Sequence, residues 1–197
     1  MVRLIIFDIG GVIIDFSEEM YASYISKRFG IPYRKFARAL ERYVPYMELG
    51  DEKAGDMEKK LAREFGLTVK ELGWASSYRK LAKPKTNVIN LARMLSRKYK
   101  VVLLTNVSYS RYIEARRLLR GLINERIFAS CYLHMRKPSR RIYLHVLKAL
   151  HVKPGEAVFI DNMSENVEGA KKVGIKALRF TSYAKLVKDL KRLGVEA

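Results

Sequence analysis

Cysteine and histidine are scarce in this sequence, and their scarcity narrows the kinds of protein it can encode. A single cysteine, Cys131, among 197 residues excludes an internal disulfide framework and favours a reducing compartment, the cytoplasm. Cys131 lies in an apolar stretch and is interpreted as a small buried hydrophobic residue. His134, His145 and His151 follow no ligand spacing, so we expect them to be structural or surface residues.

Long hydrophobic runs are also missing. No apolar run approaches the roughly 20 residues that a membrane span needs, and no signal-peptide pattern opens the chain. Glutamine is absent, while Lys, Arg and Glu are abundant, a composition typical of thermophiles. We therefore expect a cytoplasmic protein with no membrane partner, long enough for one good core and a small additional module.

Acidic residues are outnumbered by basic ones. The chain has 39 Lys and Arg against 20 Asp and Glu, a net charge of +19, and the basic residues are spread along its whole length. Such a field attracts anions, including phosphate esters, nucleotides and nucleic acids. No zinc spacing, RNP-like aromatic pattern or clear helix-turn-helix accompanies the charge. Nucleic acid therefore stays open as a partner without support from a motif.

The first fifteen residues contain the most informative pattern. Residues 4–7 form a wholly apolar run that ends abruptly in Asp8, and Gly10 and Gly11 follow before a second apolar run ends in Asp15. A run that is apolar on both faces predicts a central parallel strand. A carboxylate at its carboxyl end points into the crevice where open α/β sheets bind ligands. The alternative is that Asp8 only caps the following turn.

Residues 16–83 follow helical periodicity and predict a small all-helical module. Apolar positions recur at helical spacing within residues 21–29, 36–44, 57–65 and 72–74. Pro45 is expected to end or kink the second helix, with a loop over residues 47–51. The segment 83–85 is the expected return point. The sequence thus predicts a core made of residues 1–15 and 84–197 with a helical cap, 16–83, inserted after the first strand.

Helices and strands alternate in the rest of the chain. Apolar runs at 101–104, 127–131, 158–160 and 177–180 are separated by amphipathic segments at 86–95, 108–120, 138–150, 163–173 and 183–193. This alternation is typical of an α/β fold with a doubly wound parallel sheet.

Polar residues follow three of the expected strands. Asp8, Thr105-Asn106 and Asp161-Asn162 come directly after apolar runs, and Lys137 precedes a proline-opened helix. Because the carboxyl ends of parallel strands share one edge, these side chains should converge. A carboxylate can act as a nucleophile, a hydroxyl and a lysine can stabilise a transferring group, and a divalent cation binds such oxygens. Helix or turn caps for the carboxylates and the Thr-Asn pair, and a solvated position for Lys137, are the alternatives.

Four segments also resemble a known family. They read FDxGGV at 7–12, LTN at 104–106, MRKPxxRIY at 135–143 and FIDNxxxNVxxA at 159–170. In order and spacing they are similar to the four motifs of the haloacid dehalogenase-like (HAD) hydrolase superfamily, and most similar to small phosphatases with Asp-x-Gly in the first motif. The resemblance implies a Rossmann-like core with a helical cap.

The resemblance also implies roles for individual residues. Asp8 would be the nucleophile that attacks phosphorus, and Thr105 and the amide of Asn106 would hold phosphate oxygens. Lys137 would bridge Asp8 and the phosphate. Mg²⁺ would lie between Asp8, the carbonyl of Gly10 and the acidic loop at Asp161-Asn162. Asn166 is expected to orient that loop or cap its helix.

Two positions depart from the family pattern. Most phosphatases of the family have a general acid and base where this chain has Gly10, and such help is typically worth about 10²–10⁴-fold. Close relatives carry a second Asp where this chain has Asn162, so we expect weaker Mg²⁺ binding. The departure at Gly10 predicts a slow enzyme.

The cap is expected to select the substrate. Arg42, Tyr43, Tyr46 and Glu48 near the cap turn are the residues we expect to face the cleft. The basic composition favours a small, multiply anionic phosphate ester such as a sugar phosphate or nucleotide. The leading prediction is a Mg²⁺-dependent phosphomonoesterase. A metal-independent 2-haloacid dehalogenase, or a catalytically weak binding protein for an anionic ligand or nucleic acid, remains the alternative.

Overall fold

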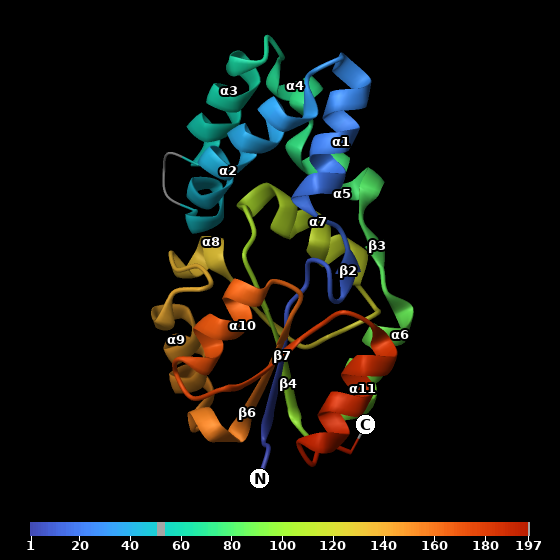
Figure 1. The fold of residues 1–197 in the computed structure, drawn as a ribbon, viewed down its shortest axis with the longest axis vertical. Coiled ribbons are helices and arrows are strands. Elements are labelled where there is room, and N and C mark those ends of the chain that lie inside the picture. The colour runs from blue at the N-terminus through green and yellow to red at the C-terminus, as the bar shows by residue number, and fades with distance from the viewer. Residues whose placement is uncertain (51–53, 197) are drawn as a thin grey trace.

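A computed structural model describes residues 1–50 and 54–196 of the chain, and it has an α/β core covered by a helical cap (Figure 1). The core sheet has the strand order β5-β4-β1-β6-β7. All four neighbouring pairs are parallel. The strands are β1 (Leu4–Phe7), β4 (Lys100–Thr105), β5 (Arg126–Ala129), β6 (Ala157–Asp161) and β7 (Lys176–Arg179). The predicted doubly wound parallel sheet is confirmed.

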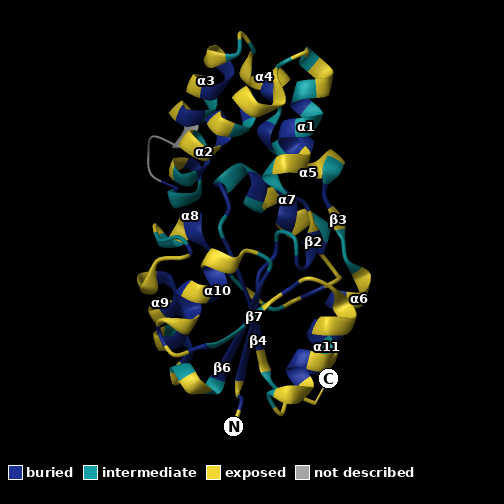
Figure 2. Ribbon diagram, viewed as in Figure 1, coloured by how far each residue is buried: buried dark blue, intermediate teal, exposed yellow. Residues whose placement is uncertain are grey.

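Strand β1 is the centre of the sheet because both of its faces are apolar and buried. Ile5 and Phe7 belong to one hydrophobic cluster, which includes residues of α6 (Thr86–Leu95) and α11 (Tyr183–Arg192). Leu4 and Ile6 belong to the opposite cluster, with residues of α9 (Arg140–Leu150) and α10 (Ser164–Lys171). The period of two along the strand thus distributes its side chains between two helical layers. Figure 2 shows the resulting buried centre and exposed outer helix faces.

In the part of the cap that the structure describes, five helices follow β1 in the chain and lie over the carboxyl ends of the strands (Figure 1). They are α1 (Glu18–Phe29), α2 (Tyr33–Leu49), α3 (Ala54–Glu64), α4 (Val69–Leu72) and α5 (Trp74–Leu81). An aromatic cluster fills the cap, in which the ring of Tyr21 lies 5.8 Å from that of Phe36 and 5.1 Å from that of Trp74. The predicted helical insertion after the first strand is therefore confirmed.

The structure corrects two details of the cap prediction. Helix α2 continues through Pro45 to Leu49, so Pro45 does not end it, and residues 47–49 are helical rather than a loop. The helix ends instead at Gly50, whose φ of 64° is left-handed, and the remainder of the expected loop lies outside the described residues. The last cap helix is two helices, because Gly73 at φ 56° separates α4 from α5.

Cap and core are joined by two short antiparallel strands, β2 (Ile14–Asp15) and β3 (Lys83–Pro84), which pair Ile14 with Pro84 and Asp15 with Lys83. The backbone N–H of Lys85 extends this ladder by donating to the carbonyl of Ile13 at 2.8 Å. Its Nζ donates to the carbonyl of Gly11 at 2.8 Å and lies 3.2 Å from Asp15 Oδ1. The chain therefore enters and leaves the cap at the same place.

The remaining core elements are α7 (Tyr109–Leu119), α8 (Ser130–Leu133) and a 3₁₀ turn at Pro154–Glu156. Helix α9 begins at Arg140, two residues after Pro138, with Ser139 as its N-cap. Across the described residues, no helix has the length and hydropathy that spanning a membrane requires.

The contact of Gly50 with α8 gives a direct test of the cap–core packing. A Cβ at Gly50 would lie 2.1 Å from the carbonyl oxygen of Cys131, whereas a Cβ at Gly30, also left-handed at φ 68°, would meet nothing within 4 Å. Gly30→Ala should lower the free energy of unfolding by about 1–2 kcal/mol, the cost of the left-handed conformation alone. Gly50→Ala should cost about 3 kcal/mol or more, because the backbone must also move. Urea unfolding measures both, and equal losses would contradict the close approach.

Candidate functional site

The carboxyl ends of three adjacent strands bring the candidate residues together. Asp8 follows β1, and its backbone N–H donates to the carbonyl of Ile160 at 2.8 Å, which keeps it level with the end of β6. Thr105 is the last residue of β4 and Asp161 the last of β6. Asp8, Thr105 and Asp161 are all buried. The sheet register therefore fixes their backbones before any ligand binds.

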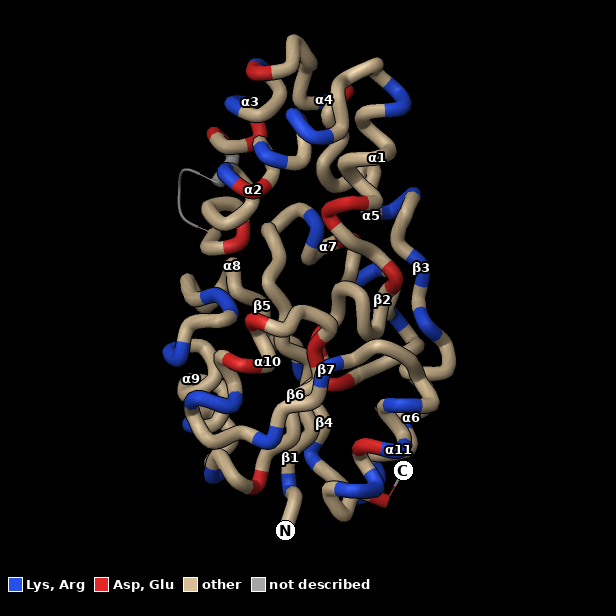
Figure 3. Tube along the Cα trace, in the orientation of Figure 1, with Lys and Arg blue, Asp and Glu red and all other residues tan. Residues whose placement is uncertain are grey.

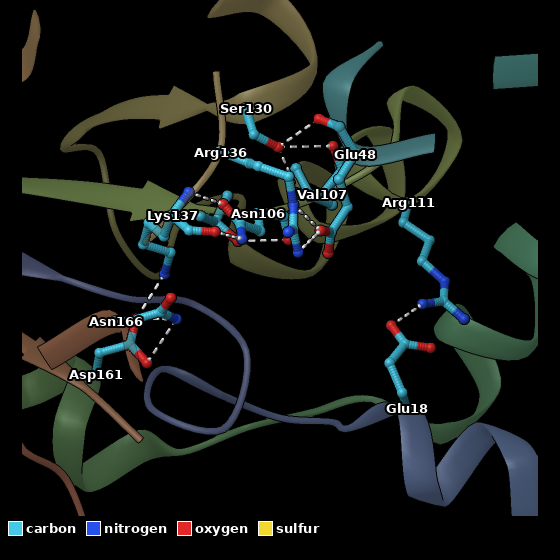
Figure 4. A network of polar contacts seen from close by, with 11 residues as sticks. Glu18, Glu48, Asn106, Val107, Arg111, Ser130, Arg136, Lys137, Asp161 and Asn166 are labelled. Atoms are coloured by element: carbon cyan, nitrogen blue, oxygen red, sulfur yellow. Dashed lines mark hydrogen bonds and ion pairs between the residues drawn. The ribbon is translucent and has the colours of Figure 1, made fainter. Parts of the chain in front are cut away.

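Lys137 lies between two of these carboxylates. Its Nζ is 2.7 Å from Asp161 Oδ2 (Figure 4). It is also 2.8 Å from Asp8 Oδ1 and donates to the carbonyl of Leu104 at 3.2 Å. The Lys137 side chain is only 1% exposed. A buried ammonium surrounded by acceptors in this way is fully hydrogen-bonded and fixed in place.

Burial and charge act in opposite directions on this group of three. Burial raises the pKa of Asp8 to about 7, and repulsion from Asp161 acts in the same direction, while Lys137 opposes both. Burial by itself would lower the pKa of Lys137, but attraction to Asp161 and Asp8 outweighs it, so the pKa is raised and the lysine is cationic. Two carboxylates and one ammonium leave an excess of negative charge in a desolvated place.

Asp161 is occupied by hydrogen-bond donors on both oxygens. Its Oδ1 accepts from the Met163 N–H at 2.8 Å, and the Asn166 amide donates to Oδ1 at 3.1 Å and to Oδ2 at 3.0 Å, beside Lys137. Asn166 therefore orients this carboxylate, as expected. Asp161 itself is not among the residues that line the cleft, and its Oδ2 accepts from Lys137.

Asn106 positions Lys137 from the other side. Its side-chain Nδ2 donates to the Lys137 carbonyl and its Oδ1 accepts from the Lys137 N–H, both at 2.9 Å. The amide group thus clamps the backbone of Lys137. The backbone N–H of Asn106 and the second hydrogen of its Nδ2 are left as candidate donors to a phosphate oxygen.

A cleft of about 230 Å³ lies above this group, between the cap and the core. Asp8, Gly10, Thr105, Lys137 and Asn162 contribute to its floor. Both contacts of Asp8 with described residues use Oδ1, which leaves Oδ2 for the cleft. The predicted convergence of these residues is therefore present in the geometry.

Cap residues form the other wall of the cleft. Phe16, Glu18, Glu48, Trp74 and Tyr78 line it on this side. Glu48 binds Arg136 through Oε2, at 3.1 Å to Nε and 2.9 Å to Nη2. Burial raises the pKa of Glu48, and Arg136 opposes that shift. The expectation that Glu48 faces the cleft agrees with this placement.

Arg111 is a cleft residue that the sequence analysis missed. Its guanidinium lies 3.2 Å from the centroid of the Trp74 ring, and its Nη1 donates to Glu18 Oε1 at 2.6 Å (Figure 4). The residue is 3% exposed. The sequence does contain a pattern that indicates burial of Arg111. This arginine precedes the buried Ala115 and Leu119 at intervals of four residues, so all three lie on one face of α7. An arginine at a core position of a helix requires an acidic or aromatic partner.

Arg42 and Tyr46 do not line the cleft. Arg42 donates to Glu64 Oε1 at 2.6 Å on the outside of the cap, and Tyr43 donates to the other oxygen of Glu64 at 2.9 Å. Tyr46 is 53% exposed. The expected substrate-binding role of Arg42 and Tyr46 has no support in this geometry, because the helical phase of α2 turns them outward.

The oxygens at the floor fit a magnesium ion. Mg²⁺ prefers oxygen ligands, keeps several waters and needs only one or two protein carboxylates when substrate phosphate binds as well. Asp8, the carbonyl of Gly10 and the amide oxygen of Asn162 supply such a set, and the excess negative charge around Lys137 favours a cation. A Cβ at Gly11 would lie 2.6 Å from Asn162 Nδ2, so glycine lets Asn162 approach the first loop. The described residues contain no cluster of three His, Cys, Asp or Glu that would form a metal site by itself.

Sequence comparisons agree with this arrangement. Over 193 residues the chain is 27% identical to the sesquiterpene phosphatase astK of Aspergillus oryzae. This match covers 95% of this chain and 94% of the relative. A shorter match of 68 residues is 40% identical to the flavin mononucleotide hydrolase 1 of Arabidopsis thaliana, and covers 34% of this chain and 28% of that protein.

Solved structures share the fold. A HAD family enzyme from Bacteroides thetaiotaomicron, in complex with magnesium and inorganic phosphate, superimposes with a TM-score of 0.78 at 19% identity, over 94% of this chain and 99% of that one. A HAD-like hydrolase from Porphyromonas gingivalis gives 0.78 at 23% identity, with full coverage of both chains. The L-2-haloacid dehalogenase PA0810 superimposes with a TM-score of 0.67 at 18% identity, over 92% of this chain and 85% of that one.

The family itself is assigned from the sequence. Residues 2–174, most of the chain, match the haloacid dehalogenase-like hydrolase family. The match includes the three strand ends and the Lys137 segment that meet at the floor of the cleft. With the sheet order, the inserted cap and the buried Asp8–Lys137–Asp161 group, it establishes that this chain belongs to the haloacid dehalogenase-like hydrolases.

Proposed function

We propose that the protein is a Mg²⁺-dependent phosphomonoesterase that works through an aspartyl-phosphate on Asp8. The observation that carries the proposal is the buried Lys137, placed 2.8 Å from Asp8 and 2.7 Å from Asp161 at the floor of the cleft. The relative astK is a phosphatase, and the Bacteroides enzyme holds magnesium and phosphate. Both support a phosphate ester as the substrate class.

In the first step Asp8 Oδ2 attacks phosphorus, a bond forms between them, and the bond from phosphorus to the ester oxygen breaks. Lys137 and the Thr105 hydroxyl stabilise the charge on the transferring phosphoryl oxygens. The leaving group departs with a proton as an alcohol. In the second step a water molecule attacks the aspartyl-phosphate, which releases inorganic phosphate and restores the Asp8 carboxylate.

Asp8, the Gly10 carbonyl and Asn162 are the residues that we assign to Mg²⁺. A bound Mg²⁺ supplies positive charge that neutralises phosphate oxygens and favours the ionised form of Asp8. Asp161 is assigned a different task from the one expected at first. Its two oxygens accept from Lys137, Asn166 and Met163, so it positions the lysine.

Gly10 has no side chain to protonate the leaving group. Water or the substrate must supply that proton, and the lost general acid corresponds to about 10²–10⁴-fold in rate. We therefore propose a slow enzyme. We also assign residues 16–83 to the cap and 1–15 with 84–197 to the catalytic core, since β2 and β3 meet at that boundary.

The nucleophile is tested by Asp8→Asn. Hydrolysis of p-nitrophenyl phosphate with Mg²⁺ should fall to background, because an amide cannot form the aspartyl-phosphate. Asp56→Asn, at an exposed ion pair with Lys59 in α3, is the matched control and should keep wild-type turnover. Residual Asp8→Asn activity near wild type, with circular dichroism confirming the fold, would refute Asp8 as the nucleophile.

The metal site is tested by thermal unfolding with and without Mg²⁺. At 100 times Kd a bound ion adds about 2.7 kcal/mol to the free energy of unfolding, which raises Tm by about 5–10 °C. Asn162→Asp should bind Mg²⁺ about tenfold more tightly, because it adds a carboxylate beside the ion. Asn90→Asp, on the exposed face of α6, should leave the affinity unchanged. Equal affinity of wild type and Asn162→Asp would remove Asn162 from the site.

A further inference from the structure

We infer that the proposed phosphatase acts on a monophosphate ester whose leaving group is small, uncharged and largely apolar. The inference rests on the proposed function, because it concerns the part of the cleft beyond the phosphate site. It is carried by the pairing of the cleft cations, by two carboxylates at the mouth of the cleft and by the aromatic wall of the cap.

Every Arg and Lys among the described residues that line the cleft already has an acidic partner. Lys137 pairs with Asp8 and Asp161, Arg136 lies 2.9 Å from Glu48 Oε2, and Arg111 lies 2.6 Å from Glu18 Oε1. The side chains of Lys137 and Arg111 are 1% and 4% exposed, so neither can leave its buried pair for a second anion. Breaking such pairs is strongly unfavourable. Arg111 Nη2 is buried without a hydrogen-bond partner among the described residues, and the charge of this guanidinium is balanced by Glu18.

Two further carboxylates, Glu19 and Glu165, line the cleft and are exposed. Glu19 is in the first turn of α1 and Glu165 in the first turn of α10, where the helix N-termini stabilise a negative charge. Within the described part of the chain neither has an ion-pair partner. A second anionic group on the substrate would therefore meet uncompensated negative charge at the mouth of the cleft.

The wall facing this region is aromatic and rigid. Phe16, Trp74 and Tyr78 line it, and the guanidinium of Arg111 lies within 3.2–6.0 Å of their ring centroids. The Trp74 indole N–H is satisfied by the Ser108 hydroxyl at 2.8 Å, so it offers no free donor to a polar leaving group, and the three rings are largely buried in the wall. A planar or otherwise apolar leaving group packs on such a surface.

The size of the cleft sets a further limit. Its volume of about 230 Å³ is below the roughly 300–1,000 Å³ of pockets that take drug-sized ligands. The leaving group therefore has the dimensions of a single ring or a short chain.

This inference replaces the multiply anionic ester that the composition favoured. The net charge of +19 resides mainly outside the cleft, and Figure 3 shows Lys and Arg spread over the outer helices α9 and α11 and along β3. The bulk charge of the chain thus says little about the charge of its substrate.

The test compares two esters of the same shape, 4-carbamoylphenyl phosphate and 4-carboxyphenyl phosphate, which differ in one negative charge on the leaving group. With Mg²⁺ at low ionic strength, kcat/KM for the amide should exceed that for the carboxylate by about tenfold, and added salt should narrow the difference. An equal or higher kcat/KM for the carboxylate, in protein that hydrolyses p-nitrophenyl phosphate, would overturn the inference alone. Absence of hydrolysis of all three esters would overturn the proposed function itself.

Variants locate the source of the discrimination. Glu19→Gln should reduce the preference for the amide about two- to fivefold, because it removes one charge at the cleft mouth. The Glu165→Gln variant should have an effect of the same sign. Glu168→Gln, on the same helix α10 but paired with Lys171 outside the cleft, is the matched control and should retain the full preference. If Glu19→Gln and Glu168→Gln behave alike, the cleft carboxylates do not select the substrate.

Discussion

The buried ammonium of Lys137 organises the site, because the carboxylates of two separate strands depend on it for their charge balance. Asp8 at the end of β1 and Asp161 at the end of β6 lie on adjacent strands, and without a cation between them both carboxylates could not stay ionised in a desolvated place. Asn106, after β4, holds the Lys137 backbone by two hydrogen bonds. The sheet thus fixes the carboxylates, and the lysine fixes the loop that follows α8. A preorganised cation of this kind requires no rearrangement when negative charge develops on a transferring group.

The cap completes the site from the other side by ion pairs and hydrogen bonds that cross to the core. Glu18 of α1 binds Arg111 of α7, Arg79 of α5 binds Glu114 of α7, and Glu48 of α2 binds Arg136. The Ser130 hydroxyl adds to these by donating to the Glu48 carbonyl at 2.6 Å. These contacts neutralise the cations of the cleft as they hold the cap in place. Cap closure and the electrostatics of the cleft are therefore set by the same side chains.

The fold and the floor of the site could be predicted from the sequence because both depend on short-range patterns. The doubly apolar run at residues 4–7 identified the central strand, and strand-end residues such as Asp8 and Thr105 converge because parallel strands share an edge. The cap wall could not be predicted in the same way. Whether Arg42 or Glu48 faces inward depends on the helical phase of α2, and that phase continued through Pro45. The pairing of Arg111 with Glu18 joins residues 93 positions apart and is a tertiary property.

The short ladder of β2 and β3 closes the inserted cap segment at its base. Because Asp15 and Lys83 are direct partners, the two ends of the inserted segment lie side by side, and a tight turn could replace it without altering the order of the sheet. An insertion at this point covers the carboxyl ends of the strands and preserves their order in the sheet (Figure 1). The cap residues that line the cleft can therefore change without displacing Asp8 or Asp161 from the ends of their strands.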